Sequence, residues 1–452
     1  MTHLYEKAKD WAMYTPSLQL QSARRIIKDT VAGRAENMPA NLSMRDFNYL
    51  DASNRFWSYT CCLATAAQFK NCNNNAVSYA NPAKTFVLGD SAGYQIGTGT
   101  LEEIKSWQSL AKHPEKVMAL WRESNVKSEI LQWMELSCTF APTIDMPLWV
   151  RNDDKGNKSP FRNCSEQQLI DLSVENLRFF NDHRGRHRPL KLISVLQGTS
   201  IESEEAWWQA VKPYPFEGFA FAGHVGQMGG VYRVLRRMLL LRDQKMLGGV
   251  FELVHILRLS RLPWAPLMTA AQQAVRDTTN SPEFRITMDS SSPYRVAGVT
   301  TEYVTTAKLG ADIKDWAMSP IPLPVGYGIA NLADPVPLHT VSDVLPVPFD
   351  NPIAQLLTLQ DLQPKKGAYD VRNIDQFADE VMINQNVYAY VNSVIRANQA
   401  VFGPDPDAPQ IIMDAVGVIN DLFNAERWET VLEANRVLLA KAAGDTITAD
   451  AS

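Results

Sequence analysis

Three aspartates and one glutamine stand where short apolar segments of the chain end. They are Asp90, Asp145, Gln197 and Asp289. A cluster of carboxylates suits chemistry at a glycosidic carbon, because one carboxylate can attack the carbon while a second moves the proton of the leaving group. Neighbouring carboxylates also raise one another's pKa, which keeps one of them available as an acid near neutral pH. For any single aspartate, the alternative is that it caps a helix.

A repeated pattern between residues 80 and 295 indicates the elements that position these side chains. Short apolar segments end in polar or glycine-containing turns, and segments of helical periodicity follow them. The pattern predicts strands at residues 85–88, 137–140, 192–196, 218–222, 250–257 and 285–288. It predicts helices at residues 100–113, 166–181, 202–211, 231–244 and 267–277.

This alternation predicts parallel strands joined by helices. Asp90, Gln197, Gly223 and Asp289 would then gather at the carboxyl ends of the strands, where a TIM (β/α)8 barrel places its active site. A doubly wound open sheet also collects ligand groups at strand ends, but no glycine-rich dinucleotide motif follows the predicted strands. The sequence therefore favours the α/β class and a TIM barrel.

The composition of the sequence changes beyond residue 318. Prolines recur from there to Pro352, which resists regular structure, and two helical patterns follow at residues 374–401 and 409–443. We therefore expect a barrel domain at residues 1–345 and a helical C-terminal extension at residues 346–452. The last residues, 446–452, are expected to be frayed.

Five segments of the chain, which read DSAGYQ, APTID, VLQG, GFAFAG and ITMDSSSP in this order, resemble motifs of the tRNA-guanine transglycosylase family. Residues 90–95 (DSAGYQ) resemble the family's DSGGFQ or DSGGYQ motif, and residues 141–145 (APTID) resemble the segment with its base-recognising aspartate. Residues 195–198 (VLQG) resemble its VQG element, and residues 218–223 (GFAFAG) resemble its glycine pair. Residues 286–293 (ITMDSSSP) resemble the nucleophile segment DCVLPTR. Together these segments span about half of the chain, between residues 80 and 300.

The resemblance implies a base exchange and assigns roles to the polar side chains. Asp289 would be the nucleophile that attacks C1′ of a guanine nucleotide. Asp90 would be the general acid and base for the departing guanine and the incoming 7-deazaguanine. Asp145 and Gln197 would read the Watson–Crick edge of the base, with backbone groups at Gly223.

The same resemblance completes the base-binding set. Tyr94 would stack on one face of the base, and Leu257 would cover the other face unless it packs in the core. Ser91 and Gly198 belong to the same motifs. His255 and His224 are further candidates for substrate contact, with neutral structural histidines as the alternative.

The chain departs from the family in its cysteines and in two motif glycines. Family members usually carry a CxCxxC motif and a later histidine that bind a structural zinc, whereas no cysteine here follows Cys164. We therefore expect no cofactor and no metal, since a zinc site at the early cysteines would need an unusual spacing. Ala92 and Ala222 replace two motif glycines, which would narrow the base site.

These departures resemble the DNA-directed branch of the superfamily, which inserts 7-deazaguanines into phage or bacterial DNA. The resemblance implies guanine in DNA and a free base such as 7-cyano-7-deazaguanine (preQ0) as substrates. One alternative keeps the enzyme class with tRNA as the polymer, and another is a non-catalytic subunit that binds nucleic acid. The carboxylates alone also allow a glycoside hydrolase, which would expose tryptophans near the strand ends: Trp149, Trp207, Trp208 and Trp264.

A net charge of −5 gives no overall attraction to nucleic acid, so local basic patches would have to hold phosphates. One patch lies at residues 183–191 and another at residues 233–245, with a solvated loop and a solvated helix face as the alternatives. The expected phosphate contacts are Arg184, Arg186, Arg188, Arg236, Arg237, Arg258, Arg261 and Arg295.

The composition also indicates where the protein works. The first thirty residues carry charges that interrupt any signal peptide, and no apolar run approaches the length of a membrane span. Five cysteines without a paired pattern are typical of reduced thiols. We expect a cytoplasmic protein, in the host cytoplasm if a phage encodes it, without a membrane partner.

Overall fold

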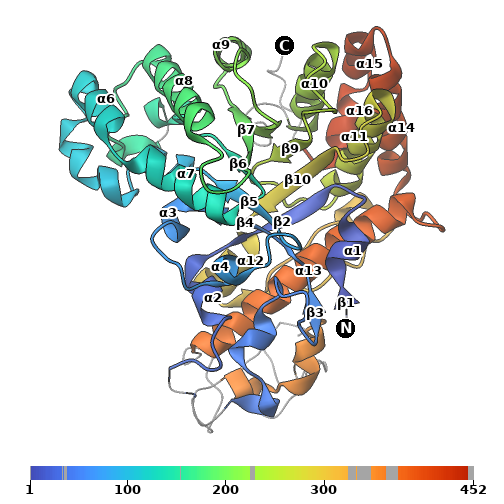
Figure 1. Cartoon of the computed structure of the whole chain (residues 1–452). Coiled ribbons are helices and arrows are strands. Elements are labelled where there is room, and N and C mark those ends of the chain that lie inside the picture. The colour runs from blue at the N-terminus through green and yellow to red at the C-terminus, as the bar shows by residue number, and fades with distance from the viewer. Residues whose placement is uncertain are drawn as a thin grey trace.

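A closed barrel of eight parallel strands forms the centre of the computed structural model, and it confirms the predicted TIM barrel (Figure 1). The structure describes residues 2–32, 34, 38–152, 154–223, 230–323, 332, 348–362 and 375–445. Around the barrel the strand order is β10-β2-β4-β5-β6-β7-β8-β9. The strands are β2 (Met13–Leu18), β4 (Cys61–Thr65), β5 (Phe86–Asp90), β6 (Phe140–Pro142), β7 (Lys191–Leu196), β8 (Gly218–Phe221), β9 (Leu253–Ile256) and β10 (Arg285–Ser290).

Helices follow the strands and cover the outside of the barrel. After β4 come α3 (Ala66–Phe69) and α4 (Ala76–Tyr79), and after β5 come α5 (Gly93–Thr98), α6 (Pro114–Glu123) and α7 (Val126–Ser137). The remaining barrel helices are α2 (Leu20–Arg25) after β2, α8 (Glu166–His183), α9 (Ile201–Val211), α10 (Gly230–Asp243), α11 (Trp264–Thr279) and α12 (Ser292–Thr300). The segment predicted as a helix at residues 100–113 is instead a 3-10 helix at Glu102–Leu110.

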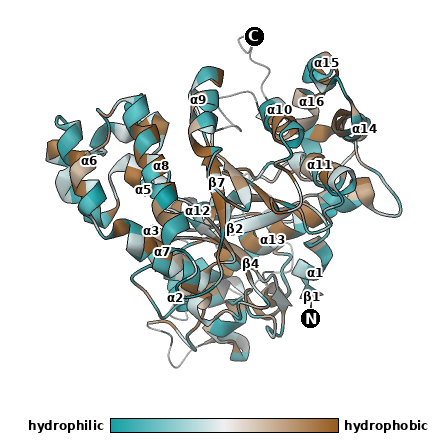
Figure 2. Ribbon diagram, turned by 45° about the horizontal axis from the view of Figure 1, so that its top comes forward, coloured by the Kyte–Doolittle hydropathy of each residue, from teal (hydrophilic) through white to brown (hydrophobic). Residues whose placement is uncertain are grey.

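The core lies inside the barrel and between the strands and their helices. Every residue of β4 and β8 is buried, as expected for parallel strands that are covered on both faces. Figure 2 shows apolar residues along β7 and β4 and hydrophilic residues over much of α6 and α9. This packing fixes the strand ends, and therefore the side chains that stand on them.

Four helices follow the proline-rich segment, most of which lies outside the described residues, as does the predicted boundary at 345/346. They are α13 (Gln376–Phe402), α14 (Gln410–Asn424), α15 (Trp428–Ala434) and α16 (Arg436–Ala443). The prediction of a single helix at residues 409–443 is therefore wrong, because the helical conformation is interrupted near residues 425–427 and at Asn435. The helices pack on the barrel, with α13 against α12, α14 against α11 and α16 against α10.

Polar side chains of α13 join this helix to the barrel. Asn384 Oδ1 accepts a hydrogen bond from Trp57 Nε1 at 3.1 Å, and Asn386 Oδ1 accepts one from the Val304 amide at 2.7 Å. The extension is thus bonded to the barrel through buried groups. Among the described residues, no helix is both long enough and apolar enough to cross a membrane.

Candidate active site

The four polar residues singled out from the sequence lie at the carboxyl ends of neighbouring and opposite strands. Asp90 is the last residue of β5, and Gln197 directly follows β7. Asp145 comes three residues after β6, whereas Asp289 lies inside β10 rather than after it. Because all eight strands are parallel, these ends share one mouth of the barrel.

Asp289 is buried at 6% exposure, and the described residues form a hydrogen bond with only one of its two carboxylate oxygens. Oδ1 accepts a hydrogen bond from the Arg258 backbone N–H at 2.8 Å, and His255 Nε2 lies 3.4 Å from the same oxygen. Within the part of the chain that the structure describes, Oδ2 makes no hydrogen bond. The free oxygen is the atom expected of a nucleophile.

His255 is the neighbour of Asp289 inside the barrel. The register of β9 and β10 sets His255 opposite Thr287, and His255 Nδ1 lies 2.9 Å from Thr287 Oγ1. His255 is 2% exposed, and its Nε2 has no hydrogen-bond partner among the described residues. When Thr287 donates to Nδ1, the ring proton sits on Nε2 and faces Asp289. His255 was only a minor candidate from the sequence, and His224 lies outside the described residues.

Asp90 is held by both oxygens. Thr65 Oγ1 donates to Oδ2 at 2.8 Å, and the Ala92 amide donates to Oδ1 at 3.1 Å. Burial raises the pKa of Asp90 and the charge of Asp289 raises it further, while the hydrogen bonds and His255 oppose the rise. A carboxyl with a raised pKa beside an anchored carboxylate is the pairing that acid catalysis and nucleophilic attack require.

Sequence reasoning missed Thr65, because the strand that carries it was not predicted. The register of β4 and β5 pairs Thr65 directly with Asp90. The available signal was the short apolar run at residues 61–64, which ends in a polar residue just as the other strand ends do. Ala92 takes the left-handed conformation, with φ 71°, and its N–H donates to Asp90.

Asp145 is paired with Gln197, whose amide also forms hydrogen bonds with the backbone of Met146 and Leu148. Gln197 Nε2 donates to Asp145 Oδ2 at 2.6 Å and to the Met146 carbonyl at 3.3 Å, while Oε1 accepts from the Leu148 amide at 3.0 Å. Gln197 therefore orients Asp145 in this structure, and both N–H groups of its amide are already engaged. Burial raises the pKa of Asp145 to about 7.

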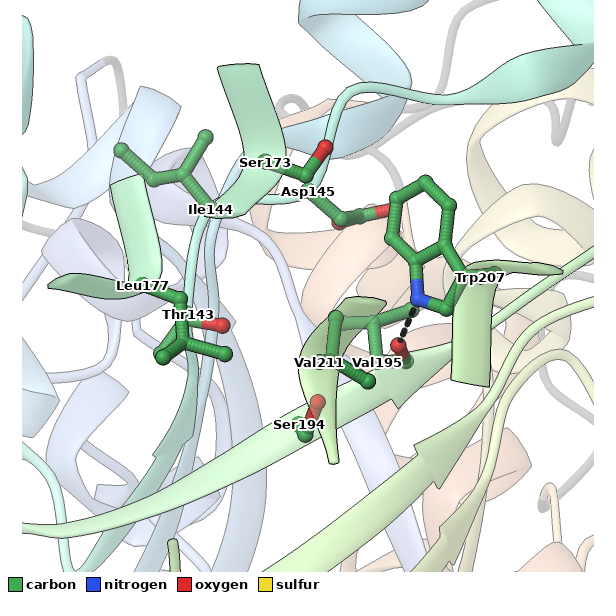
Figure 3. Close-up of a pocket in the computed structure, with 9 residues that line it drawn as sticks. All are labelled: Thr143, Ile144, Asp145, Ser173, Leu177, Ser194, Val195, Trp207 and Val211. Carbon is green, nitrogen blue, oxygen red and sulfur yellow. Dashed lines mark hydrogen bonds between the residues drawn. The ribbon is translucent and has the colours of Figure 1, made fainter. Parts of the chain in front are cut away.

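The space behind Asp145 is closed. Figure 3 shows the side chains that line it, including Trp207, whose Nε1 donates to the Val195 carbonyl at 2.7 Å. These side chains leave no space for a water molecule. A ligand of Asp145 therefore has to approach from the barrel mouth.

Two motif glycines have packing explanations. A Cβ at Gly198 would meet the Glu204 amide nitrogen at 2.5 Å, so Gly198 allows β7 and α9 to approach closely. A Cβ at Gly93 would meet Asp145 Oδ1 at 3.0 Å. Gly223 has φ 82°, which favours glycine, and it immediately precedes residues that the structure does not describe.

The remaining base-site candidates differ in their exposure. Tyr94 is 49% exposed, and its ring centroid lies 6.0 Å from that of Trp149. Leu257 is half-buried and packs against the core, which agrees with its alternative interpretation. Ser91 is buried.

Three tryptophans that a glycoside hydrolase would expose lie in the core. The indoles of Trp207, Trp208 and Trp264 are at most 1% exposed, while Trp149 is half-buried. These three tryptophans are therefore not available to line a sugar-binding cleft, which was the reason to consider a glycoside hydrolase.

We expected basic patches beside the barrel mouth. The patch at residues 183–191 lies instead at the opposite end of the barrel. It connects α8 to the amino end of β7, and there Arg184 pairs with Glu217 at 2.7 Å while Arg188 donates to the Leu136 carbonyl at 2.7 Å. Arg186 is exposed in the same loop. A phosphate bound there would be on the far side from Asp289.

The other arginines expected to contact phosphate differ in their burial and in their ion pairs. Arg237 is 2% exposed and ion-paired with Glu204, so the expectation that it contacts phosphate is wrong. Arg236 is half-buried on α10, and Arg295 is exposed in the first turn of α12. Arg261 pairs with Asp445 at 2.5 Å, and Arg258 is exposed beside Asp289.

No group of three or more His, Cys, Asp or Glu side chains that could hold a metal ion occurs in the described ranges. Cys61 and Cys62 are buried in β4, and burial raises the pKa of the Cys62 thiol to about 12, which disfavours a metal-binding thiolate. No model of a known protein family matches the chain, and no curated protein matches it.

Proposed function

We propose that this protein exchanges guanine in DNA for a free 7-deazaguanine base through a covalent intermediate on Asp289. The observation that carries the proposal is the state of Asp289, whose Oδ1 is anchored at 2.8 Å by the Arg258 amide while Oδ2 is free of hydrogen bonds among the described residues. An anchored carboxylate with one free oxygen is oriented for attack on an anomeric carbon.

In the first half-reaction, Asp289 Oδ2 forms a bond to C1′ as the bond from C1′ to guanine N9 breaks. The Asp90 carboxyl, with its raised pKa, gives its proton to the departing guanine. In the second half-reaction the incoming 7-deazaguanine gives its N9 proton to Asp90 and attacks C1′, which releases Asp289. Two inversions retain the configuration of the sugar carbon.

Asp145 supports the choice of a purine with a guanine-like edge. Gln197 fixes its carboxyl through Oδ2 at 2.6 Å, and the closed packing behind it leaves no space for a water molecule. An ionised carboxylate accepts hydrogen bonds from the N1–H and the exocyclic amino group of guanine, whereas adenine has an acceptor at N1. Tyr94 is exposed at the mouth and offers an aromatic face on which a base can stack.

The polymer is proposed from the sequence rather than from the site. The absence of cysteines after Cys164 resembles the DNA-directed branch and disfavours tRNA. C1′ of a stacked nucleotide is out of reach of a recessed carboxylate, so the target nucleotide has to be turned out of the strand. One glycosidic bond replaces another of similar energy, so the exchange itself needs no energy source.

The proposal is tested by incubating the protein with radiolabelled 7-cyano-7-deazaguanine and guanine-containing DNA or, separately, unmodified tRNA. We expect label in DNA with the native protein and with Asp421→Asn, an exposed control on α14. Asp289→Asn should abolish incorporation because an amide cannot form the glycosyl ester. Label only in tRNA would move the activity to the other polymer, and undiminished incorporation by Asp289→Asn would refute the proposal.

A further inference from the structure

Arg258 has a backbone conformation that arginine rarely adopts. Its φ is 64°, in the left-handed region where a side chain costs free energy and glycine does not. The Arg258 N–H donates a hydrogen bond to Asp289 Oδ1, 2.8 Å away. Glycine would supply the same N–H without strain, so the backbone contact does not explain why the residue is an arginine.

The side chain of Arg258 is a cation without a carboxylate partner among the described residues. Arg237 and Arg261, by contrast, are both engaged with acidic side chains. The Arg258 guanidinium carbon instead lies 5.9 Å from the ring centroid of Tyr94. Arg258 is exposed, so the guanidinium is open to a ligand from solution.

The contact between Arg258 and Tyr94 crosses the mouth of the barrel. Arg258 follows β9 and Tyr94 follows β5, and the order β9-β10-β2-β4-β5 places these strands on opposite sides. A cation, an aromatic ring and the anchored carboxylate of Asp289 therefore surround one opening. An aromatic ring stacks on a base, and a guanidinium binds phosphate oxygens in a bidentate manner.

We propose that Arg258 binds the phosphodiester group beside the nucleotide that Asp289 attacks, while Tyr94 stacks on the base. This inference rests on the proposed function and assigns the site to a polymer rather than to a free nucleoside. The guanidinium leaves the Tyr94 ring for the phosphate when a base takes its place. Through its N–H, the same residue keeps the nucleophile oriented, so binding of the strand and alignment of Asp289 are coupled at one position.

Arg258→Gly tests the inference because glycine retains the N–H and accepts a positive φ. Binding is measured with a short fluorescent single-stranded DNA that contains one guanine, and with the matching RNA, over a series of salt concentrations. We expect the Kd for the strand to weaken on the order of tenfold. The slope of log Kd against log salt should fall by about 0.7, the loss of one phosphate contact on a single strand. Thermal stability should be unchanged or higher, since the strain is removed.

Arg427→Ala is the matched control, because Arg427 is exposed beside α15 and away from the mouth. It should leave both Kd and slope as in the native protein. Arg258→Lys should keep the salt slope and lose part of the affinity, since an ammonium lacks the bidentate geometry. Equal affinity and slope for Arg258→Gly and the native protein would overturn the inference. So would equal losses for Arg258→Gly and Arg427→Ala.

The base-exchange assay separates this inference from the proposed function. If strand binding depends on Arg258 but no label is incorporated, the phosphate contact is supported and the proposed base exchange is refuted. If label is incorporated and Arg258→Gly has the native KM for the strand, the base exchange is supported and the phosphate contact is refuted. A loss confined to DNA or to RNA identifies the polymer whose phosphate Arg258 holds.

Discussion

At the scale of single residues, the site is a set of carboxyl groups in three different states. Among the residues that the structure describes, Asp289 has one hydrogen-bonded oxygen and one without a hydrogen bond. Asp90 is held by both oxygens and has a raised pKa, and Asp145 is fixed by Gln197. Three aspartates with the same side chain thus differ in hydrogen bonding because their neighbours differ, and the three roles that we propose for them rest on this difference. The sequence identified these aspartates as a group, but not the hydrogen bonds that distinguish them.

The raised pKa of Asp145 predicts that binding of a free guanine base depends on pH. Burial raises this pKa to about 7, and only the ionised carboxylate accepts hydrogen bonds from both guanine donors. Guanine should therefore bind more tightly as the pH rises from about 6 to about 8, by up to about tenfold per pH unit below the pKa. Isothermal titration calorimetry across this range measures the effect.

Asp145→Asn provides the control for this dependence. The amide does not titrate, so the variant should bind guanine weakly and with the same Kd at each pH. A native protein whose Kd does not change with pH, or an Asp145→Asn variant that retains the full dependence, would show that another group reads the base.

Residue contacts at the site were partly predictable from sequence. The order of strand ends brought Asp90, Asp145 and Asp289 to one mouth, because parallel strands leave their carboxyl ends on one side. The sequence could not show that Gln197 turns toward Asp145, since this depends on the packing of β6 and β7 side chains. The burial of Arg237 against Glu204 was hidden for the same reason.

At the scale of elements, the strands with continuous apolar runs were predictable and two others were not. β2 contains Pro16 and two polar residues, so it does not stand out by composition, whereas β4 has a short apolar run at residues 61–64 that was not predicted as a strand. They form strands because the barrel has to close: β2 pairs with β10 on one side and with β4 on the other. Such pairing is a tertiary effect that overrides local propensity.

One threonine ties three elements together and yields a test of the C-terminal extension. Thr269 of α11 is fully buried, accepts a hydrogen bond from the Ala12 amide at 2.9 Å and donates one to Asn398 of α13 at 2.6 Å. Thr269→Val keeps the shape but leaves both partners unsatisfied, so the free energy of unfolding should fall by about 1–3 kcal/mol. Urea unfolding measures this loss.

Thr278→Val is the control in the same helix, because the exposed Thr278 bonds only within α11, to the Ala274 carbonyl at 2.7 Å. Its effect should stay within about 0.5 kcal/mol. If the two variants unfold alike, the bridge from α11 to α13 contributes nothing to the stability of the barrel.

At the scale of the whole molecule, the two ends of the barrel carry different charge arrangements. At the amino end, Arg184 and Lys191 are paired with Glu217 and Glu252 at 2.7 Å and 2.5 Å. At the carboxyl end, Arg258 stands beside recessed carboxylates without an acidic partner among the described residues. With a net charge of −5, the protein would attract a polyanion only locally, and the mouth is where we expect the strand to bind.

The most direct test of the account is to locate the covalent bond itself. The protein is incubated with guanine-containing DNA without an incoming base, denatured and digested with trypsin, which releases residues 286–295 (ITMDSSSPYR) as one peptide. We predict that mass spectrometry finds a deoxyribosyl remnant of the DNA on Asp289 in this peptide. Base exchange with the adduct on any other residue, or with no adduct at all, would contradict the account.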